Sequence, residues 1–153
     1  MDLPRRVDLP RRILVPTDFS ETADYALEYA VALAERIGAL VDVLHVYPTP
    51  VVPPDIVITV SMLEHLARAG EESLRRKVDP LRNSGVIGDT MIKGGDARDA
   101  IIETVNALNI DLVIMGTHGK RDFRALFGSV TEGVLRSITT PVLALKPRPL
   151  RAT

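Results

Sequence analysis

The 153-residue sequence contains no cysteine and no tryptophan, and only 4% of its residues are aromatic. The lack of cysteine excludes thiol catalysis, disulfide bonds and thiolate metal sites. With so few aromatic rings, the core has to be built from Ala, Val, Ile and Leu. No apolar run approaches the ~18 residues that a membrane-spanning helix needs. We therefore expect a cytoplasmic protein with an aliphatic core.

The sequence also lacks an excess of either charge, with 19 Lys and Arg against 20 Asp and Glu and a formal net charge of −1. This balance gives no electrostatic indication of nucleic-acid or membrane binding. Hydrophobic residues make up 46% of the chain and charged residues 25%, which is the ordinary globular range. The length fits one domain with a substantial core.

The amino-terminal segment repeats the motif Asp-Leu-Pro-Arg-Arg, at residues 2–6 and 8–12. Pro4 and Pro10 oppose regular structure. The segment has no apolar stretch of the kind found in secretory signals. We predict a flexible tail over residues 1–11, with a docking arm as the alternative.

Strand-like and helix-like segments alternate along the rest of the chain. Short apolar or β-branched runs predict strands, and apolar residues at helical spacing predict helices. Ser20 and Asp96 are expected to cap two of the helices, Gly38 to end one, and Pro16 to end the first strand. This alternation is typical of an α/β fold, a parallel sheet with helices on both faces. The expected strands are 13–15, 41–47, 90–93, 111–115 and 142–145, and the expected helices are 23–37, 63–81, 97–108 and 129–138.

The loop after the fourth expected strand has the residue types that suit an anion. Residues 116–130 read GTHGKRDFRALFGSV, with three glycines, a serine and three cations. A helix begins at Gly128-Ser129, and the unpaired amides and partial positive charge of a helix amino terminus favour phosphate. The alternative is that Ser129 is only a helix cap and Gly128 only a turn residue. His118 either donates to the phosphate or structures the loop.

The loop after the first expected strand, residues 16–20, carries Asp18. In open parallel sheets, ligands bind at the carboxyl ends of strands where the winding direction reverses. A carboxylate there can accept hydrogen bonds from a ribose or a base. The alternative is that Asp18 caps the following helix, because Asp18 and Glu21 have capping-box spacing.

Established phosphate-loop and metal motifs do not match. No G-x-G-x-x-G follows the first strand, and Arg121 stands after Lys120 where a P-loop requires Ser or Thr. His45, His65 and His118 lack the spacing of zinc ligands. No residue is marked by its spacing as a base or nucleophile, so we expect neither a catalytic site nor a metal site built from protein ligands.

Five blocks of sequence, in order and at suitable spacing, resemble the universal stress protein family. The resemblance covers about residues 12–146 and implies a Rossmann-like domain over 12–147, with a C-terminal tail over 148–153. It also implies a five-stranded sheet of order 3-2-1-4-5, in which the loops after strands one and four lie side by side. The blocks are ILVPTDFS (13–20), LHV (44–46), IMGTHG (114–119), GSVTE (128–132) and PVLAL (141–145).

The ATP-binding branch of that family carries Gly-x-x-Gly, nine spacer residues and Gly-Ser or Gly-Thr. The resemblance implies that these glycines cradle the phosphates of ATP, with Mg²⁺ held mostly by phosphates and water. The loop after the first strand would meet the ribose and adenine, and Val46 and Met115 would contact the base. The implied site comprises Pro16, Thr17, Asp18, Val46, Met115, Gly116, His118, Gly119, Gly128, Ser129 and Val130.

The chain departs from that pattern by one residue, because only eight residues, 120–127, separate Gly119 from Gly128. Losing one residue shortens the path by ~1.5 Å if it is helical and by up to ~3.5 Å if it is extended. Lys120, Arg121 and Arg124 either compensate for this or are simply solvated.

The favoured function is that of a regulatory module which binds ATP, AMP or another adenine nucleotide and acts on an unknown protein partner. The alternatives are a dimeric stress-response scaffold that binds no nucleotide, and a very slow ATPase or phosphotransferase. A homodimer through residues 142–146 is expected, because a short apolar edge strand invites pairing about a two-fold axis. The alternative is that the C-terminal tail covers this edge.

Overall fold

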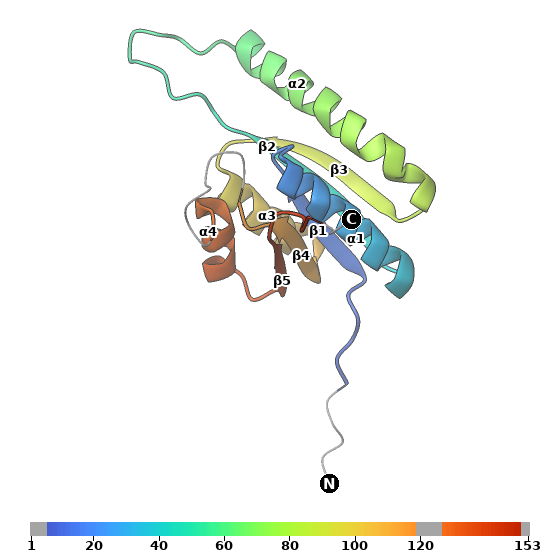
Figure 1. Cartoon of the computed structure of the whole chain (residues 1–153). Helices are drawn as coiled ribbons and strands as arrows, with labels where there is room; N and C mark the ends of the chain where they lie inside the picture. The colour runs from blue at the N-terminus through green and yellow to red at the C-terminus, as the bar shows by residue number, and fades with distance from the viewer. Residues whose placement is uncertain (1–5, 119–126, 151–153) are drawn as a thin grey trace.

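The computed structural model describes residues 6–118 and 127–150, which form a five-stranded parallel sheet with helices on both faces (Figure 1). The strand order is β3-β2-β1-β4-β5, so the predicted fold and order are confirmed. No helix in the described part of the chain is long and apolar enough to cross a membrane. The strands are β1 (Arg12–Thr17), β2 (Leu40–Tyr47), β3 (Ile87–Gly94), β4 (Leu112–Gly116) and β5 (Val142–Leu145). The helices are α1 (Glu21–Ile37), α2 (Val60–Val78), the 3-10 helix η1 (Asp79–Ser84), α3 (Ala97–Leu108) and α4 (Ser129–Ser137).

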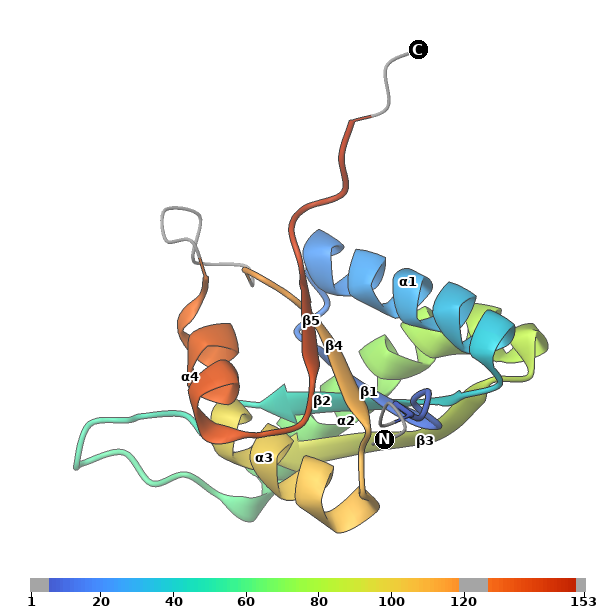
Figure 2. The ribbon, with the colours of Figure 1, turned by 90° about the horizontal axis from the view of Figure 1, so that it is seen from below.

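Helices α1 and α2 cover one face of the sheet, and α3 and α4 cover the other (Figure 1, Figure 2). Side chains of a strand alternate between these two layers. On β1, Ile13 and Val15 pack toward α1, whereas Leu14 packs toward α3 and α4. All three are fully buried, as expected of parallel strands covered on both sides.

The predicted helix ends are confirmed at three positions. The Ser20 hydroxyl accepts from the amide of Ala23 at the start of α1, and the Asp96 carboxylate accepts from the amide of Asp99 at the start of α3. Gly38 ends α1 with φ 73°, a left-handed conformation that favours glycine.

The prediction that Pro16 ends the first strand is wrong, because β1 continues to Thr17. The Arg12 carbonyl accepts from the amide of Asp111 beside β4, so even-numbered residues of β1 turn their backbone polar groups toward β4. The ladder with β4 ends at Leu14, while pairing with β2 continues to Thr17. The missing amide of Pro16 therefore faces β4 and fits the end of that ladder at Leu14, whereas the pairing with β2 does not need it.

Helix α2 and strand β3 also differ from their predicted bounds. Helix α2 begins at Val60, three residues early, and changes to η1 at Asp79 because Pro80 cannot continue the α-helical bonding. Strand β3 begins at Ile87, not Thr90, because the pairing with β2 continues past a register shift.

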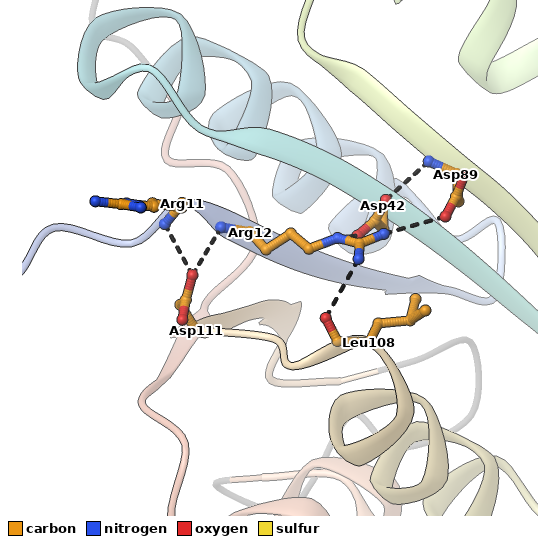
Figure 3. Close-up of polar contacts among 6 residues, drawn as sticks. All are labelled: Arg11, Arg12, Asp42, Asp89, Leu108 and Asp111. Carbon is orange, nitrogen blue, oxygen red and sulfur yellow. Dashed lines mark hydrogen bonds and ion pairs between the residues drawn. The ribbon is translucent and has the colours of Figure 1, made fainter.

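A charged network joins strands at the end of the sheet opposite the carboxyl ends (Figure 3). Arg12 donates from Nε to Asp42 at 2.8 Å, and a terminal nitrogen of the same side chain lies 3.1 Å from Asp89. Asp42 also accepts from the amide of Asp89 at 2.7 Å. The carboxylate of Asp111 accepts from the amides of Arg11 and Arg12, both at 2.9 Å. One buried carboxylate, that of Asp42, thus connects β1, β2 and β3.

Candidate functional site

A cleft of about 550 Å³ opens at the carboxyl end of the sheet, where β1 and β4 end side by side. Walls of the cleft come from β1, β2 and β4 and from the first turns of α3 and α4. Gly119 and the nearby cations Lys120, Arg121 and Arg124 lie outside the described residues. The other ten residues of the predicted site all line the cleft: Pro16, Thr17, Asp18, Val46, Met115, Gly116, His118, Gly128, Ser129 and Val130.

Residues 17–20, which join β1 to α1, form a turn held by local hydrogen bonds. The Thr17 hydroxyl accepts from the amide of Phe19, and the Asp18 carboxylate accepts from the amide of Ser20, both at 3.0 Å. Phe19 has φ 64°, which is unusual for a residue other than glycine. Since Ser20 caps α1, the alternative that Asp18 is the cap is wrong. Asp18 instead folds the turn, and it is exposed at the cleft.

Hydrogen bonds bring together the two described ends of the β4–α4 connection. The amide of Gly128 donates to the carbonyl of Thr117 at 2.6 Å, and the Thr131 hydroxyl donates to the carbonyl of Gly116 at 2.8 Å. The amide of Thr117 donates to Leu145 of β5 at 2.7 Å. This places the start of α4 against the end of β4, at the rim of the cleft.

The amino terminus of α4 faces this rim with its first-turn amides. Gly128 is the cap, with an extended backbone, so the alternative that Ser129 serves only as the cap is wrong. The amide of Glu132 donates to the carbonyl of Gly128, which is the first regular hydrogen bond of the helix. The partial positive charge of a helix amino terminus favours an anion near Val130.

His118 takes part in the structure of this connection, because its Nδ1 lies 2.9 Å from the Thr117 hydroxyl. Thr117 is itself buried. The prediction that His118 structures the loop is therefore confirmed for its contact with Thr117. His118 also lines the cleft.

A steric requirement that the sequence did not reveal explains why residue 116 is a glycine. A β-carbon at this position would lie 2.6 Å from Cγ2 of Thr22 in α1, so only glycine lets the end of β4 approach α1 this closely. Sequence analysis had assigned Gly116 to the phosphates alone.

Sequence reasoning missed the wall of the cleft that belongs to α3. Asp96, Ala97 and Ile101 line it, with Leu44 adding to the apolar part. The signal was present in Gly94-Gly95-Asp96, a strand-to-helix turn at the same carboxyl edge of the sheet. Strand β3 is the edge strand beyond β2, so strand order alone does not bring this turn to the crossover between β1 and β4. Its residues belong to the candidate site because Gly95, Asp96 and Ala97 line the cleft.

The described residues contain no group of three or more His, Asp or Glu side chains that could hold a metal ion. The site instead combines an apolar part, near Val46, Met115 and Ile101, with a helix amino terminus. The exposed carboxylate of Asp18 lies on the β1 side of the cleft. Such an arrangement suits a ligand with a flat apolar ring, hydroxyl groups and an anionic end.

Comparison with known proteins gives a consistent result. Residues 10–146 match the Universal stress protein family. The chain is 29% identical over 150 residues to Universal stress protein MJ0577 of Methanocaldococcus jannaschii, covering 87% of this chain and 93% of that protein. The solved structure of MJ0577 superposes with a TM-score of 0.73 at 28% identity, covering 92% and 98% of the two chains.

Two more distant structures share the fold and are complexes. One is a universal stress protein in complex with cAMP, at TM-score 0.67 and 23% identity, covering 92% of this chain and 100% of that one. The other is the universal stress protein from Archaeoglobus fulgidus in complex with dAMP, at TM-score 0.64 and 22% identity, covering 88% and 96%.

Proposed function

The chain belongs to the universal stress protein family, and from this we propose that it binds ATP or another adenine nucleotide and acts as a nucleotide-dependent module in a stress response. The observation that carries the proposal is the cleft at the carboxyl ends of β1 and β4. It combines an apolar pocket with the amino terminus of α4.

Each part of a nucleotide has a matching part of the cleft. Val46 and Met115 offer apolar contact to adenine, and Asp18 offers an acceptor for ribose or base. The first turn of α4, at Val130, offers its backbone and the positive end of the helix dipole to phosphate. Two family members with the same fold are complexes with cAMP and dAMP, both adenine nucleotides, which supports this class of ligand.

Mg²⁺ would enter with the phosphates in this proposal. Magnesium in nucleotide sites keeps several waters and takes few protein ligands. Phosphoryl transfer would further require a base or a water-positioning residue at the terminal phosphate, and no observation favours one here.

The test is to identify the ligand released from purified protein by mass spectrometry, followed by calorimetric titration of ligand-free protein with ATP. We expect saturable binding and an about tenfold or greater loss of affinity in Asp18→Ala, because a hydrogen bond to a charged group contributes ~1.5–3 kcal/mol. Asp55→Ala is the matched control, because Asp55 is exposed and does not line the cleft.

Asp18→Asn separates binding from folding of the turn, because an amide oxygen can still accept from the amide of Ser20. Loss of affinity in both Asp18 variants supports a contact of the carboxylate with the nucleotide. A wild-type protein that neither carries nor binds an adenine nucleotide would refute the proposal.

We also propose a homodimer through β5, the edge strand beyond β4. The carbonyls of Pro141 and Leu145 accept from amides of the β4 segment, so the backbone groups of Val142 and Ala144 point outward. The described tail does not settle on this edge: Arg148 lies over the ring of Tyr25 in α1 and pairs with Glu28.

Ala144→Pro is expected to give a monomer in sedimentation equilibrium at micromolar concentration. Proline removes the outward amide and is tolerated where that amide does not bond within the sheet. Ala144→Val is the control that keeps the amide. Leu143 and Leu145 are poorer targets, because both pack into the core on the α1 side. A dimer that persists in Ala144→Pro would place the interface elsewhere.

A further inference from the structure

His45, near the end of β2, contacts two residues of the turn 17–20, Thr17 and Phe19. Its Nδ1 lies 2.8 Å from the carbonyl oxygen of Thr17. Because a carbonyl can only accept, Nδ1 carries the hydrogen in this bond. The His45 ring also lies against the ring of Phe19, with centroids 4.1 Å apart and planes inclined by 32°.

The turn that His45 contacts needs support from outside. Phe19 has φ 64°, a conformation that is costly for a residue with a side chain and that persists only when its surroundings hold it. The bonds made by Thr17 Oγ1 and Asp18 Oδ1 are local, to amides two residues ahead. His45 connects this local turn to the sheet.

On its other side, His45 meets helix α2. A β-carbon built on Gly70 would lie 3.0 Å from Cδ2 of His45, so the helix backbone rests against the edge of the imidazole. Gly70 is the first buried residue of α2, followed by Leu74 and Val78. The half of the helix before Gly70 is largely exposed and extends past the sheet (Figure 1).

His45 therefore lies between the turn of residues 17–20 and helix α2. The cleft is lined by His45 itself and by Asp18 and Ser20 of the turn, whereas Gly70 does not line it, so only a change at Gly70 acts on the cleft from outside. A shift of α2 at Gly70 displaces the imidazole, and a displaced imidazole loses its bond to Thr17 and its contact with Phe19.

We propose that His45 is a positioning residue that couples the packing of α2 to the conformation of residues 17–20, so that nucleotide affinity and the order of α2 are linked. The inference rests on the proposed nucleotide binding. Because linkage is reciprocal, a change in α2 alters nucleotide affinity, and nucleotide stabilises α2 by the same factor.

Three variants of the full-length protein test the coupling by ATP calorimetry. His45→Phe keeps a ring against Phe19 and Gly70 but removes the donor to Thr17, and we expect an about tenfold loss of affinity. His45→Asn places an amide donor near the position of Nδ1, and we expect it to restore part of that loss. Gly70→Ala crowds the imidazole and is expected to lower affinity although residue 70 lies outside the cleft.

Ser61→Ala is the matched control for Gly70→Ala. Both changes raise helix propensity in α2, but Ser61 is exposed and lies in the half of the helix before Gly70. We expect Ser61→Ala to bind ATP as the wild type does. Thermal unfolding of each variant shows which ones are folded. If His45→Phe does not fold, Gly70→Ala and His45→Asn still test the coupling.

Hydrogen exchange of the α2 amides distinguishes coupling from a purely structural role of His45. If His45 only stabilised the fold, ATP would not change the exchange of these amides. ATP should slow exchange in residues 60–78 of the wild type, and should slow it less in His45→Phe. Wild-type affinity in Gly70→Ala, or α2 exchange unchanged by ATP in the wild type, would overturn the coupling.

Failure of the proposed function gives a different result. If the wild type binds no adenine nucleotide, the function is refuted, and the coupling is then read from the ligand-free protein. Faster exchange at the amides of residues 17–20 in Gly70→Ala than in wild type supports it, and equal exchange overturns it.

Discussion

Replacement of Gly128 by valine is expected to lower the affinity for ATP by about 100-fold while the protein stays folded. Gly128 has φ −67° and ψ 163°, an extended conformation that any residue adopts, so the substitution adds no backbone strain. It is the cap of α4 and lines the cleft. A valine side chain there would occupy the space of the proposed phosphate site. The loss corresponds to ~2.7 kcal/mol, the upper part of what one hydrogen bond to a charged group contributes.

Gly133→Ala is the control for this experiment, because it changes the same helix away from the cleft. A β-carbon at residue 133 would meet the side chain of Arg98, which is exposed and able to move. Calorimetry should show unchanged ATP affinity in this control, and thermal unfolding should show both variants folded. Wild-type affinity in Gly128→Val would mean that the phosphates do not approach the start of α4, and that the spacer of eight residues changes the register of the site.

Much of the fold could be predicted because local and long-range signals agree. The apolar run Leu112–Met115 has no alternation, which indicates a strand buried on both faces, and Val113, Ile114 and Met115 are indeed buried. Ser20 and Asp96 cap helices as their positions before apolar repeats predict. The strand order came from the resemblance of five sequence blocks, and periodicity alone would have left it open.

The site was harder to predict, because its contacts join residues far apart in the sequence. Nothing near Gly116 in the sequence points to Thr22, yet their close approach explains the glycine. Pro16 was expected to end its strand because the pattern does not say which neighbour the missing amide faces. His45 was considered only as a metal ligand, since its contacts with Thr17 and Gly70 depend on how β1 and α2 pack against β2.

Asp42 shows the same limit at the opposite end of the sheet. It stands within an apolar strand, where a carboxylate is costly unless it is paired. Its partner, Arg12, ends the repeated Asp-Leu-Pro-Arg-Arg motif just before the predicted first strand, and no sequence rule relates the two. The strand register brings the two side chains within reach of each other. Arg12 of β1 lies opposite Leu40 of β2, so Asp42 is two residues farther along β2.

Arg12→Met is expected to destabilise the protein by about 3–5 kcal/mol, the usual cost of leaving a buried charge without its partner. The Asp42 side chain is 0% exposed and receives one hydrogen bond from Arg12 Nε and another from the amide of Asp89. The hydrogen bond to Asp42 also raises the pKa of the Arg12 guanidinium above its ordinary value. Arg12 therefore stays charged throughout the working pH range. Urea unfolding at fixed protein concentration measures the change without screening the pair by salt.

Two further variants show which contact of Arg12 carries this stability. Asp89→Asn removes the outer partner, which is 65% exposed, and should cost less than about 1 kcal/mol, as exposed ion pairs do. Arg12→Met combined with Asp42→Asn should recover part of the loss, because a neutral amide oxygen can still accept from the amide of Asp89 without a buried charge. With Asp42→Asn also measured alone, the coupling between residues 12 and 42 is the difference between the double variant and the sum of the two single ones. If Arg12→Met costs no more than Asp89→Asn, the guanidinium acts only as a surface charge. The buried carboxylate would then be stabilised by the β3 amide, and the connection of β1 to β2 at this end would depend on the strand ladder alone.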